Sequence, residues 1–153
     1  MSIDYFGHTD PEKAVIGEID FSDIVNEKEV ISSNRYKVKN IGQCKIEIYE
    51  NEGQIPHFHI TGISKTFNCC VRIYEPYFFI HGNKCRDTLN TNQCKELDTW
   101  LRQQNKNSIG NMSNWEAIVF MWYTFNPDCK YPEFKKTNKQ PDYTRMNMFK
   151  DGI

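Results

Sequence analysis

The sequence predicts an α+β fold, a small antiparallel β-meander with two helices packed on one face. Three observations predict it. Between residues 35 and 80, short apolar segments alternate with turn residues, which is typical of successive antiparallel strands. Two segments with helical spacing and capping residues follow them. Aromatic residues make up 14% of the 153-residue chain, and they supply the volume of a single core.

The strands are predicted from alternation and from the turns between them. Cys44–Tyr49 alternates strictly between apolar and polar residues, as a half-buried strand does. Asn51–Gln54 and Gly62–Lys65 contain the glycine and polar residues of turns. The predicted strands, from first to last, are residues 15–21, 36–38, 44–49, 57–61, 67–74 and 77–80.

Two helices are predicted after the last of these strands. Asn90 and Gln93 have the spacing of a helix N-cap and its partner, and apolar residues recur at helical spacing to about residue 104. Ser113 and Glu116 form a stronger capping box. They open Trp115–Tyr123, which is apolar nearly all round and therefore predicts a buried helix.

The charge is unevenly distributed along the chain. The first thirty residues carry eight acidic residues and two lysines, a balance of −6, whereas the whole chain has a net charge of −1. The overall charge gives no attraction to nucleic acid or to an anionic membrane. We divide the chain into an acidic N-terminal leader, an α+β domain and a basic C-terminal tail, at residues 1–34, 35–127 and 128–153.

The sequence predicts a cytoplasmic protein. Met1–Asp10 lacks the basic start and apolar run of a signal peptide. The longest apolar stretch, around Ala117–Tyr123, is too short to cross a membrane. The cysteines contain no C-x-x-C pair and are predicted to be free thiols; they are Cys44, Cys69, Cys70, Cys85, Cys94 and Cys129.

Strand alternation sorts the side chains onto two faces. The side predicted to meet the helices carries Ile46, Ile48, Phe58, Ile60, Phe67, Val71 and Ile73. The opposite side, left for water or a partner, carries Lys45, Glu47, Tyr49, His57, His59, Asn68, Cys70, Arg72 and Tyr74. A tight turn at Gly62–Lys65 pairs His59 with Asn68 and His57 with Cys70, and His81 is expected at the edge.

The two histidines support several interpretations. As metal ligands, His57 and His59 would need a third ligand from Glu52, Glu47 or Cys70, and the ion, a divalent transition metal, could activate water for hydrolysis. A nucleophilic pair of Cys70 and His57 ranks below the metal.

The same face also suits a phosphate or a nucleic acid. His57, His59, Arg72 and Lys45 offer donors, while Tyr49 and Tyr74 offer stacking surfaces. In a purely structural interpretation the histidines only hydrogen-bond across an exposed strand, which is the most frequent role of an isolated H-x-H pair.

The segment Tyr49–Ile60, with its Asn-Glu turn followed by Pro-His-Phe-His, resembles the opening of the bacterial domain-of-unknown-function family 4160. The likeness extends over residues 48–127, through Trp100-Leu101 to Asn114-Trp115. The family implies a small protein found in toxin–antitoxin-like or mobile-element settings, without an established activity. It carries over Glu52, His57 and His59 as shared motif positions, whereas the leader and tail depart from its compact pattern.

These observations lead to two hypotheses. The first is a bacterial or phage accessory module that binds a protein or a nucleic acid through the His57/His59 face, with Glu52, Arg72, Tyr49 and Tyr74 as further binding residues. The alternative is a metal-dependent hydrolase, conceivably a nuclease, with His57, His59 and Glu52 at the metal. The sequence does not decide the oligomeric state.

Overall fold

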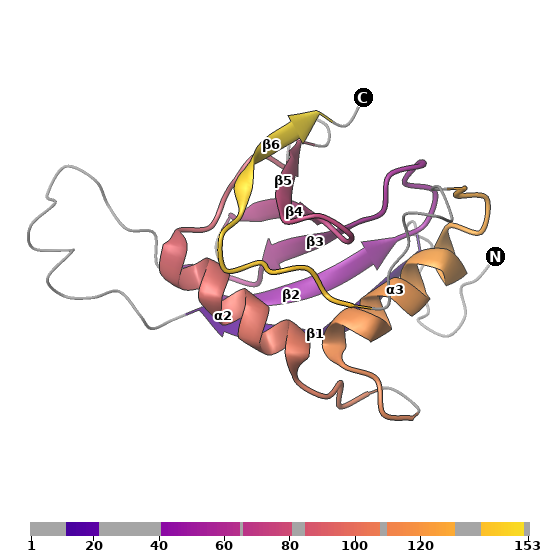
Figure 1. Ribbon diagram of the computed structural model, residues 1–153, viewed down its shortest axis with the longest axis horizontal. Coiled ribbons are helices and arrows are strands. Elements are labelled where there is room, and N and C mark those ends of the chain that lie inside the picture. The colour runs from indigo at the N-terminus through magenta and orange to yellow at the C-terminus, as the bar shows by residue number, and fades with distance from the viewer. Residues whose placement is uncertain are drawn as a thin grey trace, which may run out of the picture.

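The computed structural model has the predicted α+β fold, a β-meander covered by two helices (Figure 1). It describes residues 12–21, 41–64, 66–80, 85–107, 110–130 and 139–151. Within these residues the elements, in chain order, are β1 (Lys13–Phe21), β2 (Gly42–Tyr49), β3 (His57–Gly62), β4 (Asn68–Arg72), β5 (Tyr77–Ile80), α2 (Thr91–Arg102), α3 (Asn114–Phe125) and β6 (Asn147–Asp151).

The described strands form one sheet in the order β1-β2-β3-β4-β5-β6. The first five are antiparallel neighbours, and β6 pairs with β5 in parallel. The predicted strand 36–38 and residue His81 lie outside the described residues.

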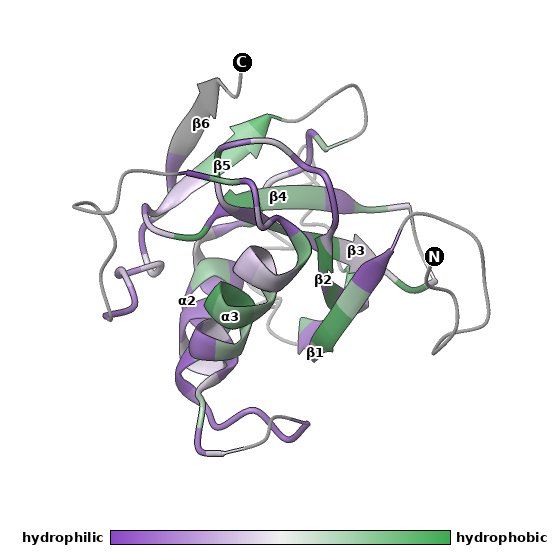
Figure 2. Ribbon diagram, turned by 90° about the vertical axis from the view of Figure 1, so that its right-hand side faces the viewer, coloured by the Kyte–Doolittle hydropathy of each residue, from purple (hydrophilic) through white to green (hydrophobic). Residues whose placement is uncertain are grey.

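Both predicted capping boxes are confirmed. Asn90 accepts from the backbone of Gln93 at the start of α2, and Ser113 accepts from that of Glu116 at the start of α3. In each box the side chain of Gln93 or Glu116 also accepts from the N–H of the cap residue. N–H groups of the first turn that would otherwise lack a partner are thus hydrogen-bonded. Figure 2 shows α2 as mostly hydrophilic and α3 as more hydrophobic, and five residues of each helix are buried.

The core lies between the helices and one face of the sheet. The apolar residues predicted for that face are all buried in it, together with Leu97 and Leu101 of α2 and Trp115, Ile118 and Trp122 of α3. The six cysteines are buried free thiols, as predicted. In the described part of the chain, no helix has the length and apolar character needed to span a membrane.

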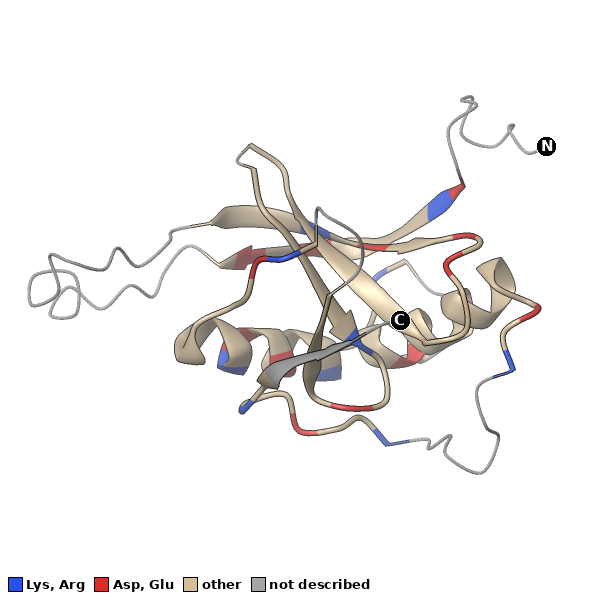
Figure 3. Cartoon of the chain, turned by 90° about the horizontal axis from the view of Figure 1, so that it is seen from above, with Lys and Arg blue, Asp and Glu red and all other residues tan. Residues whose placement is uncertain are grey.

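The sheet extends beyond both predicted domain boundaries. β1, from the segment assigned to the leader, pairs with β2 from Lys13 to Phe21, with a bulge between Val15 and Gly17. Ile16, Ile19 and Phe21 are buried. At the other end, Tyr143 of the predicted tail is fully buried and its hydroxyl donates to the Ile73 carbonyl over 2.6 Å. Figure 3 shows Lys and Arg interspersed with Asp and Glu over the described chain.

The second face of the sheet is not left for solvent, which corrects the prediction. Its central side chains Glu47, His57, His59 and Cys70 are all buried. Atoms of the β2–β3 loop, β5 and Cys85 contact them, as do Lys13 of β1 and Trp122 of α3. A polar cluster is therefore enclosed on the face opposite the helices.

Candidate metal centre

A short loop between β2 and β3 carries Glu52 to the start of β3. Its backbone has positive φ at Asn51 (55°) and Gly53 (94°), so the chain turns sharply on both sides of Glu52. The Glu52 N–H donates to Asn126 Oδ1 over 2.8 Å, and Asn126 Nδ2 donates to the Tyr49 carbonyl over 3.0 Å. Asn126 is the C-cap of α3, so the loop is fastened to the end of that helix.

Glu52 meets both histidines at a single oxygen. Its Oε1 lies 2.8 Å from His57 Nε2 and 2.6 Å from His59 Nε2. The two imidazoles lie on the same side of β3 because they are two residues apart, and their ring centroids are 5.2 Å apart. The three residues that the sequence singled out as metal ligands thus bring three ligand atoms into one small volume.

The other nitrogen of His57 fixes the orientation of its ring. His57 Nδ1 lies 2.7 Å from the Ile55 carbonyl, which can only accept, so Nδ1 carries the proton. In the neutral ring, the lone pair of Nε2 then points at Glu52 Oε1. Two such acceptors at 2.8 Å need a proton between them, or a cation that both of them coordinate. A histidine that donates from Nδ1 to a carbonyl and directs Nε2 at a carboxylate is oriented as metal-ligating histidines are.

His59 is held in the same way, but by sulfur. Its Nδ1 lies 3.3 Å from Cys70 Sγ and 3.6 Å from Cys85 Sγ. Both imidazoles therefore have a partner at Nδ1 and present Nε2 to Glu52. Such outer partners orient ligand rings and tune their basicity.

The charges of the cluster are set by these contacts. Burial raises the pKa of Glu52, but the hydrogen bonds and charges of the two histidines outweigh it and hold that pKa well below its ordinary value. Burial lowers the pKa of His59, yet its hydrogen bonds to Cys85 and Glu52 raise the pKa to about 9. Burial, partly offset by Glu52, lowers the pKa of His57, and burial raises that of Cys70. Without a metal, an anionic Glu52 therefore faces a cationic His59.

Aromatic rings shield the cluster from water. The His57 ring lies 4.6 Å from Phe79 and 5.2 Å from Trp122, and the His59 ring lies 4.8 Å from Tyr49, between ring centroids. His57 and His59 are only 1% and 7% exposed, whereas the Glu52 side chain is 15% exposed. Solvent therefore reaches the cluster on the side of Glu52.

The predicted register between β3 and β4 was wrong by two residues. His59 lies opposite Cys70 and His57 opposite Arg72, instead of Asn68 and Cys70. The connection is longer than the tight turn we predicted, because the Gly62 N–H bonds to the Phe67 carbonyl and β4 begins only after Phe67. The Cys70–His57 pair is thereby replaced by a contact between Cys70 and His59.

Two predicted binding residues lie outside the cluster. Arg72 donates to Glu75 over 2.6 Å, and its guanidinium lies 5.4 Å from the Phe79 ring. The same Phe79 ring packs against His57. Tyr74 packs edge-on against Trp115 in the helix-covered core. β4 ends at Arg72, so strand alternation no longer governs Tyr74, and the prediction that it joins the histidine face was wrong.

The structure also distinguishes between the other two residues predicted as a third metal ligand, Glu47 and Cys70. Glu47 is saturated by Lys13, Tyr49 and Thr61, at 3.1, 2.9 and 3.1 Å, and belongs to a neighbouring network. Cys70 remains available, since ligand atoms of His57, His59 and Cys70 all lie within 4.8 Å of one another. Cys85 could not be identified as a partner of His59 from the sequence, because nothing in its spacing relates it to residues on β3.

Comparisons with protein-family models, with curated proteins and with solved structures find no match to this chain. The resemblance of the Pro-His-Phe-His segment to family 4160 therefore stays a prediction. Function has to be inferred from the geometry of the cluster.

Proposed function

We propose that the protein is a metal-dependent hydrolase whose divalent transition metal is held by Glu52, His57 and His59. The convergence of both Nε2 atoms on Glu52 Oε1 carries this proposal. Two imidazoles and one carboxylate are a ligand set used by zinc and by other first-row metals in catalytic sites. Three protein ligands would leave a coordination position for water.

Each residue has a separate role in this proposal. Ile55 holds the proton of His57 on Nδ1, and Cys70 and Cys85 engage Nδ1 of His59, so both Nε2 atoms remain directed at the ion. Glu52, the most exposed of the three ligands, borders the side from which a substrate would approach. A bound metal of this kind lowers the pKa of its water and so supplies a nucleophile near neutral pH.

Cys70 is the alternative third ligand. If the ion used His57, His59 and Cys70, a thiolate would replace the carboxylate, and soft ligands of this kind favour zinc. Cobalt substitution distinguishes the two sets, because a thiolate–cobalt bond gives an intense near-ultraviolet charge-transfer band that nitrogen and oxygen ligands do not give.

The first hypothesis, binding of a protein or nucleic acid through the His57/His59 face, has less support. A partner could touch little of two imidazoles that are 1% and 7% exposed. A toxin–antitoxin-like setting remains an expectation from the resemblance. Six buried free thiols fit the reducing cytoplasm that we propose as the compartment.

The test combines metal content with hydrolysis. Protein purified without chelator is analysed for metals beside His57→Ala/His59→Ala, and both are assayed on bis(4-nitrophenyl) phosphate as a phosphodiester probe. We expect near-stoichiometric metal and metal-dependent hydrolysis in the wild type only. If the wild type binds metal but hydrolyses neither this probe nor a carboxyl ester, the proposal is reduced to a structural metal site. If the folded wild-type protein takes up no metal, the proposal is refuted.

A further inference from the structure

Two thiols lie beside the ring nitrogen of His59 that Glu52 does not contact. Cys70 Sγ is 3.3 Å from His59 Nδ1 but 4.0 Å from Nε2, and Cys85 Sγ is 3.6 Å from the same Nδ1. A hydrogen bond between the two thiols is among the causes that raise the pKa of Cys70. Two sulfurs and one imidazole nitrogen therefore lie next to one another, on the opposite side of the ring from Glu52.

Cys85 is held against β4 by hydrogen bonds on both sides of the contact. The Asn68 N–H donates to Asp87 Oδ2 over 2.8 Å, and the Asp87 N–H donates back to the Asn68 carbonyl over 3.1 Å. The Cys85 thiol itself donates to Asn68 Oδ1 over 3.4 Å. Cys70 is two residues further along β4 and points to the same side as Asn68. The fold thus fixes both sulfurs on one side of the strand.

The spacing of the three atoms suits ligands of a single metal ion. Bonds of about 2.0 Å to nitrogen and about 2.3 Å to sulfur put these two ligand atoms about 3.5 Å apart at a tetrahedral angle. The separations of 3.3 and 3.6 Å between His59 Nδ1 and the two sulfurs lie on either side of that value. An ion can therefore bind here with little displacement of the side chains.

The contact between His59 and Glu52 supports a ligand at Nδ1. When Nδ1 binds an ion, the neutral ring keeps its proton on Nε2, which lies 2.6 Å from Glu52 Oε1. A ligating histidine usually donates its other ring N–H to a carboxylate or carbonyl, and this bond orients the ring. Glu52 would then act as the outer partner of the ligand His59.

The donor atoms and their burial select a soft ion. Thiolates favour Cu(I), and Cu(I) accepts the low coordination number that these donors provide, whereas structural zinc almost always takes four ligands. Cys70 and Cys85 are 1% and 4% exposed, and they pack with Phe79 and Ile55. Such an apolar shell restricts the access of water to a bound ion.

We propose that Cys70, Cys85 and His59 Nδ1 form a binding site for a cuprous ion. Each thiol releases its proton to solvent as its sulfur binds, and the oxidation state of the copper does not change. The site shares only His59 with the proposed hydrolytic centre and uses the other nitrogen of that ring. Because the ring proton then lies on Nε2, the cuprous ion excludes a metal at Nε2, and this consequence alone rests on the proposed function.

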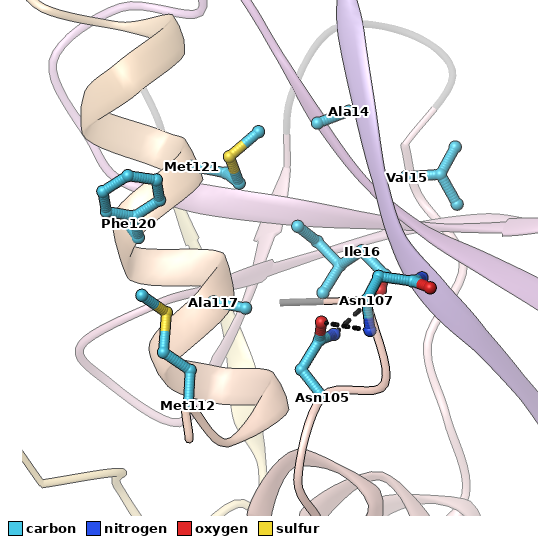
Figure 4. Close-up of a pocket in the computed structure, with 9 residues that line it drawn as sticks. All are labelled: Ala14, Val15, Ile16, Asn105, Asn107, Met112, Ala117, Phe120 and Met121. Carbon is cyan, nitrogen blue, oxygen red and sulfur yellow. Dashed lines mark hydrogen bonds between the residues drawn. The ribbon is translucent and has the colours of Figure 1, made fainter. Parts of the chain in front are cut away.

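Other sulfur atoms of the described chain supply controls. Met112 and Met121 line a hollow of about 480 Å³ between β1 and α3, and Figure 4 shows them at different ends of it. The described residues that line this hollow include no histidine or cysteine. Cys94 is a buried thiol of α2, and it donates to the Leu89 carbonyl. Met121 and Cys94 are thus sulfur residues of the core that have no place in the proposed site.

Competition with the Cu(I) chelator bathocuproine disulfonate tests the site, without oxygen and with a thiol-free reductant. We expect one Cu(I) per folded wild-type chain, with the near-ultraviolet charge-transfer band of a copper–thiolate bond. Cys70→Ser and Cys85→Ser should each weaken binding by more than the roughly 10–100-fold that loss of an outer contact causes. Cys94→Ser and Met121→Leu should bind Cu(I) as the wild type does, and circular dichroism checks that each variant is folded.

The variant His57→Gln separates this site from the proposed hydrolytic centre. It removes a ligand of that centre and none of the cuprous site, so it should lose zinc and keep Cu(I). No tight Cu(I) binding by the folded wild type, unchanged affinity in Cys85→Ser, or loss of Cu(I) in Cys94→Ser or His57→Gln would overturn the proposal. Wild-type protein that binds Cu(I) as expected but takes up no zinc would refute the proposed function and support the cuprous site.

Discussion

The two faces of the sheet are buried in different ways. The helix-covered face holds aliphatic and aromatic side chains that pack without directional requirements. The opposite face buries Glu47, His57 and His59, and each of these has hydrogen-bond partners. Apolar burial follows from strand alternation alone, whereas polar burial requires partners brought from elsewhere in the chain. The first face therefore stabilises the fold, and the second is where we place the proposed metal centre.

The largest expected effect comes from the apolar face. Leu97→Ala removes a fully buried side chain of α2 and should lower the free energy of unfolding by about 2–5 kcal/mol. Urea denaturation measures it. The folded variant should keep its full metal stoichiometry, since Leu97 belongs to the helix-covered core. Parallel loss of metal from folded protein would show that the two faces are not separable.

Metal binding should stabilise the protein through the polar face. Zinc at a hundred times its dissociation constant should add about 2.7 kcal/mol to the free energy of unfolding, measured as a rise of the thermal midpoint. His57→Ala/His59→Ala is the control and should show no rise. An equal rise in both proteins would place the stabilising ion outside the cluster.

The fastening of the Glu52 loop should tune affinity without touching a ligand. Asn126→Ala removes both bonds that tie the loop to the end of α3. Loss of such supporting contacts typically weakens metal affinity by about 10–100-fold. Competition with a chromogenic chelator measures it. Ser113→Ala, at the other end of the same helix, costs about 1 kcal/mol of stability and should leave the affinity unchanged.

The stability of the metal-free protein should also depend on pH. The pKa of His59 is raised from 6.5 to about 9 in the fold, so its contribution to stability is complete below pH 6.5 and is lost as the pH rises through 9. The pKa of Glu52 is lowered from 4.5, so its contribution is present above pH 4.5 and fades in acid. Urea midpoints from pH 4 to 10 should fall at both ends, and His59→Gln should abolish the alkaline fall.

The features that the sequence predicted correctly are those set by residues close together in the chain. The capping boxes at Asn90 and Ser113 and the alternation of Cys44–Tyr49 appear in the structure where they were predicted. The H-x-H spacing singled out His57 and His59, whereas Glu52 was preferred over Glu47 and Cys70 only through the resemblance to family 4160. Their convergence depends on two left-handed loop residues and on Asn126, which lies far along the chain.

The errors arose where distant residues decide the geometry. The register of β4 was wrong because the length of a connection is not set by its turn residues alone. Tyr74 was misassigned because the Ile73 carbonyl accepts from both Trp115 Nε1 and the Tyr143 hydroxyl, and the strand ends just before it. Cys85 was overlooked because only the three-dimensional fold brings it to His59.

The most direct test of the central claim compares two glutamates on the same side of the sheet, the half-buried Glu52 and the buried Glu47. Glu52→Gln and Glu47→Gln each replace a carboxylate by an amide of nearly the same shape, one inside the proposed ligand set and one in the neighbouring network. Equilibrium dialysis with zinc should give one tightly bound ion for the wild type and for Glu47→Gln, and binding weakened by at least about tenfold for Glu52→Gln. Unchanged zinc binding in Glu52→Gln would contradict the assignment of Glu52, and no tight site in the wild type would contradict the metal centre itself.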